Sequence, residues 1–192
     1  MLRSTSVLLA LVVVLGSAAP AEAQYIDDRR GLWLGLGVGA GALKVKCEFC
    51  STSRVLGPSG FVQIGGTPTR KTLAGVEIAA WRGTAPDTTR EYVNATAFLK
   101  YYFSVSLPLF VKGGLGIGRF AEETAQGDAY SSSGFSFVLG AGYDIRIAGR
   151  FWGAPYFNLV LAPSQEGTRN RIALSSDISQ NMWQFGVRVS YH

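Results

Sequence analysis

Histidine is almost absent from this sequence, since the only one of its 192 residues that carries an imidazole is the last, His192. A Ser-His-Asp hydrolase needs a histidine as general base, and a zinc site formed with the two cysteines would need two further ligands. The neighbouring acids Glu122 and Glu123 are interpreted as solvated charge. We therefore expect no enzyme, no catalytic residue, no metal site and no cofactor.

Long apolar runs are also missing, because the longest is Val7–Leu15, which is too short to span a bilayer as a helix. Arg3 precedes this run and the small-x-small triplet 21–23 follows it, as in a secretory signal peptide. We predict a signal peptide over residues 1–23, a polar lead-in over 24–30 and a single domain over 31–192.

Charge is sparse, at 16% of residues, with a formal net charge of +5. No run of five or more Lys or Arg occurs, so a nucleic-acid partner is not expected. Cysteine is limited to Cys47 and Cys50. In an exported chain such a pair is expected to form a disulfide, here within a loop, with free or metal-binding thiols as the alternatives.

What the sequence has in abundance is alternation. In residues 183–191 a large apolar residue occupies every second position, and polar or small residues fill the gaps. Successive side chains of a strand point to opposite faces, so this segment predicts a strand with one apolar and one polar face. Seven earlier segments show the same pattern to differing degrees: 31–46, 59–67, 72–82, 91–103, 109–120, 134–147 and 152–162.

Eight such strands predict an all-β fold, an eight-stranded antiparallel up-and-down transmembrane β-barrel. An even number of antiparallel strands closes without exposed edges, and the many glycines on the inward faces of the strands leave room inside. Short connections near 67–71, 104–108 and 148–150 are expected in the periplasm, and longer polar loops near 47–58, 83–90, 121–133 and 163–179 outside the cell. Aromatic residues near the strand ends suggest interfacial girdles.

Most of the charges in the strands fall on the polar faces and are expected to point into the barrel. The interior of an eight-stranded barrel is just wide enough for side chains, and buried charges need partners. We therefore predict a barrel-interior charge network, with a thin water-filled path as the alternative. Its predicted members are Glu77, Lys100, Lys112, Asp144, Arg146 and Arg188.

Three segments, 110–116, 138–144 and the aromatic C-terminus, resemble the small outer-membrane β-barrel superfamily, which includes the outer membrane protein A transmembrane domain, outer membrane protein X and the opacity-type adhesins. The resemblance implies a monomer integral to the outer membrane of a Gram-negative-type bacterium. Its implied partners are membrane lipid, lipopolysaccharide, the outer-membrane assembly machinery and an unidentified surface ligand. Members often end in Phe or Trp, whereas this chain ends Tyr191-His192.

The expected role is structural or surface-interactive, through adhesion or binding. A narrow porin-like pore or small-solute transporter is one alternative. The other is a soluble lipocalin-like carrier, which would place its apolar residues inside and its polar residues outside.

Overall fold

The computed structural model describes residues 31–46, 53–86, 88–104, 107–125, 127–169 and 172–192. The predicted signal peptide and lead-in, together with Cys47 and Cys50, lie outside these ranges and stay predictions. Within them, no helix is long and apolar enough to cross a membrane. The strands are β1 (Leu32–Lys46), β2 (Val55–Thr69), β3 (Thr72–Ala85), β4 (Thr88–Tyr102), β5 (Leu109–Thr124), β6 (Ala129–Tyr143), β7 (Ile145–Ala148), β8 (Phe151–Arg169) and β9 (Ile172–Tyr191).

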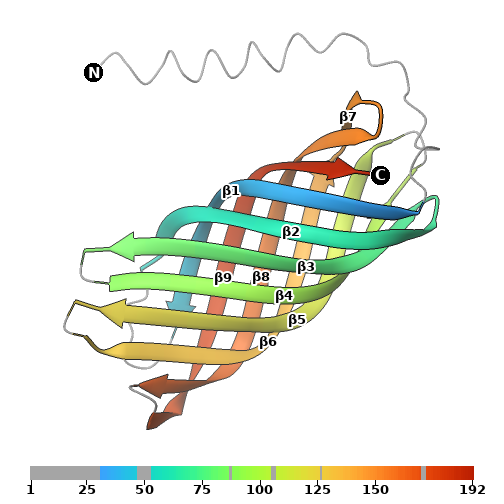
Figure 1. The fold of residues 1–192 in the computed structure, drawn as a ribbon. Coiled ribbons are helices and arrows are strands. Elements are labelled where there is room, and N and C mark those ends of the chain that lie inside the picture. Colours follow the sequence, from blue (N-terminus) through green and yellow to red (C-terminus); the bar gives the residue numbers. More distant parts are fainter. Residues whose placement is uncertain (1–30, 47–52, 87, 105–106, 126, 170–171) are drawn as a thin grey trace, which may run out of the picture.

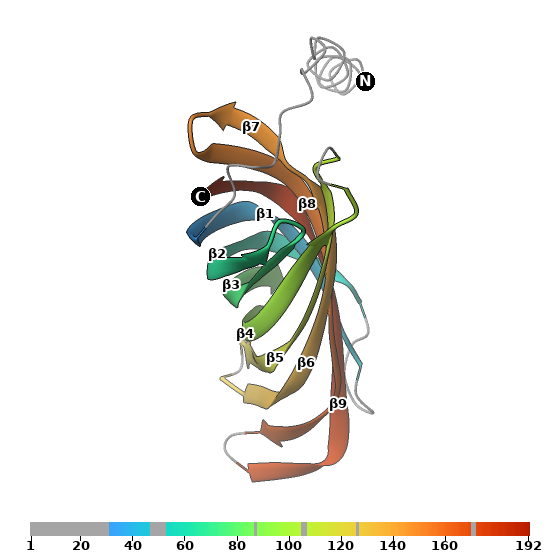
Figure 2. The same cartoon turned by 90° about the vertical axis from the view of Figure 1, so that its right-hand side faces the viewer.

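These strands form one closed antiparallel barrel (Figures 1 and 2). Consecutive strands from β1 to β6 pair with one another, β9 pairs with both β1 and β8, and β6 pairs with β8 to close the sheet. Asp144 interrupts the segment predicted as strand 134–147, and β7 continues it as a short hairpin with β8. Because β6 and β7 together make one barrel strand, the predicted eight-stranded barrel is confirmed.

The outer face of the barrel carries a continuous apolar belt, because the alternation in each strand directs its aliphatic and aromatic residues outward. Leu36 and Ile117 are examples, and both are more than 60% exposed. Charged residues on the opposite, inward face of the strands, such as Glu77 and Lys112, are buried inside. This arrangement is the reverse of a soluble lipocalin-like carrier and suits contact with lipid.

Three of the four segments predicted as long polar loops, 83–90, 121–133 and 163–179, are largely strand in the described residues, which corrects that expectation, whereas residues 47–52 of the fourth lie outside the described ranges. β3 and β4 are separated by residues 86–87, β5 and β6 by 125–128, and β8 and β9 by 170–171. Polar composition favours a loop, yet a hairpin satisfies its backbone hydrogen bonds whether its side chains are polar or apolar. The strands therefore extend past the belt as hairpins, and the β8–β9 hairpin bends away from the barrel wall (Figure 2).

We call the end of the barrel that holds residue 31 and His192 the termini end and the opposite end the far end (Figure 1). Short turns at the termini end and extended hairpins at the far end are typical of barrels whose far end faces the outside of the cell.

Nine aromatic residues near strand ends are predicted for the interfacial girdles, and only four of them lie on the outer face. Tyr101, Phe103, Trp183 and Tyr191 are exposed on the outer face. The other five are buried inside the barrel, because each falls on the inward parity of its strand: Trp81, Tyr102, Phe120, Trp152 and Tyr156. A position near a strand end therefore does not by itself place an aromatic residue on the outer face. What decides is whether the residue falls on an outward or an inward position of the alternating strand.

Gly39 and Gly186 face each other across the seam between β1 and β9. A Cβ on either residue would overlap the backbone of the opposite strand, at Phe185 O or at Val38 O. Both positions therefore require glycine for the strands to approach this closely.

Candidate functional site

The centre of the barrel interior holds a carboxylate shared between strands. The Nζ of Lys112 in β5 lies 2.9 and 3.1 Å from the two carboxylate oxygens of Glu77 in β3. The amide of Gln63 in β2 donates a hydrogen bond to the same carboxylate and accepts one of 2.7 Å from Lys100 Nζ. All four side chains are buried. A single acid thus connects three strands and indirectly holds a second lysine.

A second carboxylate lies where β6 ends. Asp144 accepts hydrogen bonds from the hydroxyl of Tyr102 in β4, at 2.7 Å, and from the guanidinium of Arg188 in β9. Its backbone N–H donates to the carbonyl of Pro108 at 3.0 Å. Because these partners come from different parts of the chain, the break between β6 and β7 is fixed from within the barrel.

Aromatic rings complete the surroundings of the interior cations. Lys100 Nζ lies 4.3 Å from the centroid of the Trp33 ring, and the Arg188 guanidinium lies 4.9 Å from that of Phe110. The electron-rich face of an aromatic ring attracts a cation, most strongly where water is excluded. Among the described residues, the centre of the barrel holds three cations but only two carboxylates, those of Glu77 and Asp144. The aromatic rings therefore add to the stabilisation of the cations.

Five of the six residues predicted for the interior network are brought together inside the barrel: Glu77, Lys100, Lys112, Asp144 and Arg188. Arg146 lies apart from them in β7, partly exposed, where its Nε donates a 3.2 Å hydrogen bond to the carbonyl of Gly149. Its strand is interrupted at Asp144, so it lies at the termini-end rim. Hereafter the interior charge network means the five buried residues with Gln63 and Tyr102.

Gln63 and Tyr102 were missed by sequence reasoning. Tyr102 shares the inward parity of Lys100, but its position at a strand end suggested a lipid-interface role instead. Gln63 lies in the segment with the weakest alternation, where parity alone gave no reason to select an uncharged residue. The signal that identifies both is a polar atom on the inward face beside a predicted charge.

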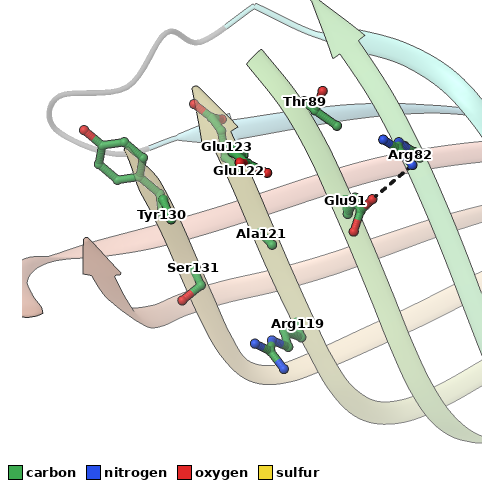
Figure 3. A pocket seen from close by; sticks show the side chains of 10 residues that line it. Arg82, Thr89, Glu91, Arg119, Ala121, Glu122, Glu123, Tyr130 and Ser131 are labelled. Carbon is green, nitrogen blue, oxygen red and sulfur yellow. Dashed lines mark ion pairs between the residues drawn. The ribbon is translucent and has the colours of Figure 1, made fainter. Parts of the chain in front are cut away.

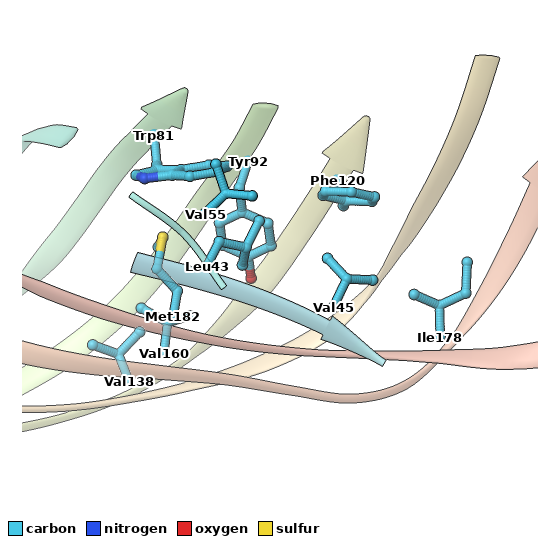
Figure 4. Packing of buried hydrophobic residues seen from close by; sticks show 10 residues of the cluster. All are labelled: Leu43, Val45, Val55, Trp81, Tyr92, Phe120, Val138, Val160, Ile178 and Met182. Carbon is cyan, nitrogen blue, oxygen red and sulfur yellow. The ribbon is translucent and has the colours of Figure 1, made fainter. Parts of the chain in front are cut away.

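Apolar side chains pack on both sides of the network. Towards the termini end they are Trp33, Leu73, Phe98, Tyr102, Phe110 and Ala154. Towards the far end lies a larger set, the distal apolar cluster, in which strands from around the barrel contribute side chains to the interior (Figure 4). Its members are Leu43, Val45, Val55, Trp81, Tyr92, Phe120, Val138, Val160, Ile178 and Met182. The interior is thus layered rather than uniformly polar.

A few polar atoms within this packing have no protein partner among the described residues. They include both amide atoms of Gln184 and the Nδ2 of Asn158, which are neighbours across β8 and β9. Buried amides of this kind are normally satisfied by internal water. Among the described residues, no group of His, Cys, Asp and Glu is arranged to hold a metal ion.

On the outside of the far end, the extended hairpins of β3 to β6 form a shallow polar groove of about 700 Å³ (Figure 3). We call it the hairpin ledge. Arg82 and Glu91 form an exposed ion pair of 3.5 Å there. The remaining lining is Thr89, Arg119, Ala121, Glu122, Glu123, Ala129, Tyr130 and Ser131. Just inside the wall, Arg90 Nε pairs with Glu122 at 2.6 Å and links β4 to β5.

No family model and no curated protein matches this sequence. Among solved structures, the chain is similar to Neisserial surface protein A, with a TM-score of 0.59 and 15% identity over 83% of this chain and 96% of that one. It is also similar to Ail, the attachment invasion locus protein of Yersinia pestis, with a TM-score of 0.54 and 14% identity over 84% of this chain and 99% of that one. A third similar structure is the outer membrane protein OprG from Pseudomonas aeruginosa, with a TM-score of 0.50 and 13% identity over 85% of this chain and 97% of that one.

At these identities the comparisons establish the fold. The similarity spans nearly the full length of the three solved structures, and it agrees with the outward apolar belt and the inward charges. The chain therefore has the fold of the small outer-membrane β-barrels, as the resemblance in its sequence implied.

Proposed function

We propose that this protein is a non-conducting outer-membrane barrel whose role is structural and surface-interactive, with the hairpin ledge as its binding surface. The observation that carries the proposal is the contrast between its two regions. The interior is filled by ion pairs and apolar layers, whereas the strands continue past the apolar belt and display a polar groove at the far end.

The filled interior opposes conduction. A passing ion would meet the Glu77–Lys112 pair and the apolar side chains on both sides of it. Apolar constrictions exclude water, and an ion would have to shed its hydration shell to cross them. The network is therefore interpreted as a core that holds the strands together.

The hairpin ledge suits a polar partner. Arg82, Glu91 and Arg119 present charges of both signs, and Tyr130 adds an aromatic ring with a hydroxyl. Because the ledge is built on paired strands, a partner binds without first ordering a loop, which lowers the entropy lost on binding. Two of the similar structures are named as a surface protein and an attachment invasion locus protein, and this supports a comparable role here.

Two measurements test the proposal. The purified barrel in a planar bilayer is expected to give no current steps. Bacteria carrying the chain are expected to adhere to surfaces coated with extracellular-matrix protein better than bacteria without it. A variant with Arg82→Ala, Arg119→Ala and Tyr130→Ala is expected to lose that gain, while the control Arg70→Ala/Lys71→Ala, at the termini end, keeps it. Adhesion that is unchanged by the ledge variant would contradict the assigned surface.

A narrow pore is the second candidate, and the partner-free amides of Gln184 and Asn158 favour it. Water at these amides would be the start of a polar path through the interior. Regular current steps whose size changes with Lys112→Met would support the pore and reject the non-conducting interpretation.

A further inference from the structure

A second groove, of about 470 Å³, lies on the outer wall where the apolar belt meets the far end. Its cationic lining is Lys44 and Lys46 from β1 and Arg54 from the residues just before β2. Phe137 from β6 and Leu161 from β8 line its apolar side. No Asp or Glu is among its lining residues in the described part of the chain. We call it the basic groove.

The cations point outward because of strand parity. Leu43 and Val45 are buried inside the barrel, so Lys44 and Lys46 between them and after them face the outer wall. Arg54 is held in place, since its guanidinium donates a 3.0 Å hydrogen bond to the carbonyl of Ala42 and lies 4.6 Å from the centroid of the Trp183 ring. An ordered guanidinium loses less side-chain entropy when it binds an anion.

The groove lies where the barrel wall changes register. The β6–β8 pairing shifts between Ser133 and Phe137, and the β8–β9 pairing shifts between Ala162 and Gln165. Such irregularities bend a strand and increase its local twist. As a result, the β8–β9 hairpin leaves the line of the wall (Figure 2), and Ala162, Pro163 and Ser179 line a hollow instead of a flat sheet.

We propose that the basic groove binds the phosphorylated headgroup of an acylated glycolipid of the outer leaflet, of the lipid A type. The three cations would contact the phosphate, and the acyl chains would lie along Phe137, Leu161 and Trp183. A cationic cluster directly above an apolar wall matches the two halves of an anionic amphiphile. This site does not depend on the proposed adhesive role of the hairpin ledge.

Asn181 adds a feature that suits a sugar. It pairs with Lys44 across β1 and β9 and lines the groove, and its Oδ1 is buried with no donor among the described residues. A hydroxyl of the glycolipid headgroup would supply the missing hydrogen bond. An unpaired buried acceptor is costly, so filling it favours a headgroup that carries hydroxyls as well as phosphate.

Native mass spectrometry of the folded barrel, titrated in detergent with diphosphorylated hexa-acyl lipid A, tests the proposal. Wild type is expected to retain one lipid, and the triple variant Lys44→Gln/Lys46→Gln/Arg54→Gln to bind it at least tenfold more weakly. The matched control Arg70→Gln/Lys71→Gln/Arg150→Gln removes the same charge at the termini end and is expected to bind as wild type does. Folding of every variant is verified by gel electrophoresis. A folded barrel migrates faster when it is unheated than after boiling.

Two further arms identify the source of the phosphate. Fully dephosphorylated lipid A is expected to bind wild type and the triple variant equally weakly, and free pyrophosphate is expected not to compete. Equal losses in the triple variant and its control would show only general attraction between charges, and would overturn the site. If pyrophosphate at the same concentration as lipid A displaced the lipid, the groove would be a simple anion site and the proposal would be overturned. Failure of the wild type to retain lipid A would also overturn it.

Discussion

The Nζ of Lys112 lies 2.9 Å from Oε2 of Glu77 in the middle of the barrel, and both side chains are only 2% exposed. Glu77 also accepts a hydrogen bond from Gln63, which in turn accepts one from Lys100. This carboxylate therefore compensates one buried lysine directly and positions the acceptor of another. Removing one partner of a buried pair leaves an uncompensated charge, which costs more than the pair contributes when it is intact.

The substitution Glu77→Gln is accordingly expected to lower the free energy of unfolding by about 3–5 kcal/mol. Urea unfolding in lipid vesicles measures the change. The control is Glu123→Gln, an exposed acid on the hairpin ledge, with an expected effect within about 0.5 kcal/mol. The double variant Glu77→Gln/Lys112→Met is expected to be more stable than Glu77→Gln alone, because position 112 then carries no charge that needs the lost carboxylate. Equal stability of the two would mean that Lys112 is compensated elsewhere.

Two adjacent tyrosines, Tyr101 and Tyr102, allow the effect of an interior hydrogen bond to be compared with that of a hydroxyl on the outer face. Tyr102 is fully buried and donates to Asp144 at 2.7 Å, whereas Tyr101 is 45% exposed on the outer face. Hydrogen bonds to charged groups contribute about 1.5–3 kcal/mol, so Tyr102→Phe is expected to reduce the unfolding free energy by that amount. Tyr101→Phe is the matched control, and a loss of similar size there would remove the special role of the Asp144 contact.

Packing against Phe61 limits the size of the residue that position 37 can hold on the inward face of β1. A Cβ at this position would overlap the ring of Phe61, whereas a Cβ at Gly113 would meet no atom within 4 Å. Gly37→Ala is therefore expected to cost about 1–3 kcal/mol, the usual range for overpacking, and Gly113→Ala to cost nothing measurable. Adding Phe61→Leu to Gly37→Ala should recover part of the loss, and a cycle of unfolding measurements that shows no coupling would contradict the overlap.

The apolar belt predicts a depth dependence along β1. Leu36 is 63% exposed near the middle of the belt, and Leu32 lies at the strand's start at the termini end. An arginine facing lipid costs about 2–4 kcal/mol at the midplane and about 0–1 kcal/mol near the interface. Leu36→Arg should therefore destabilise the barrel in vesicles much more than Leu32→Arg does, and equal effects would argue against a membrane-embedded β1.

Strand parity made most of the fold predictable. Because side chains alternate across a strand, the position of Glu77, Lys100 and Arg188 next to outward aliphatic residues is enough to place these charges inside the barrel. The same rule applied strictly would have placed Trp81 and Trp152 inside as well. Hairpin lengths were not predictable, since polar composition does not distinguish a loop from a strand that continues into water.

Other features depended on how strands meet. The eight segments specify two faces each, but no segment indicates that the Glu77 carboxylate reaches Lys112 and Gln63, or that Arg146 falls beyond a break at Asp144. Likewise, Lys44, Lys46 and Arg54 form one groove only because shifts of register bend the neighbouring wall.

By itself, then, the sequence determined the membrane barrel and which side chains face lipid, because a two-residue period is a local property of each strand. The tertiary structure alone decided which interior charges pair and where the far end forms its grooves. Pairing depends on the stagger between neighbouring strands when the sheet closes, and that stagger is a property of all the strands together.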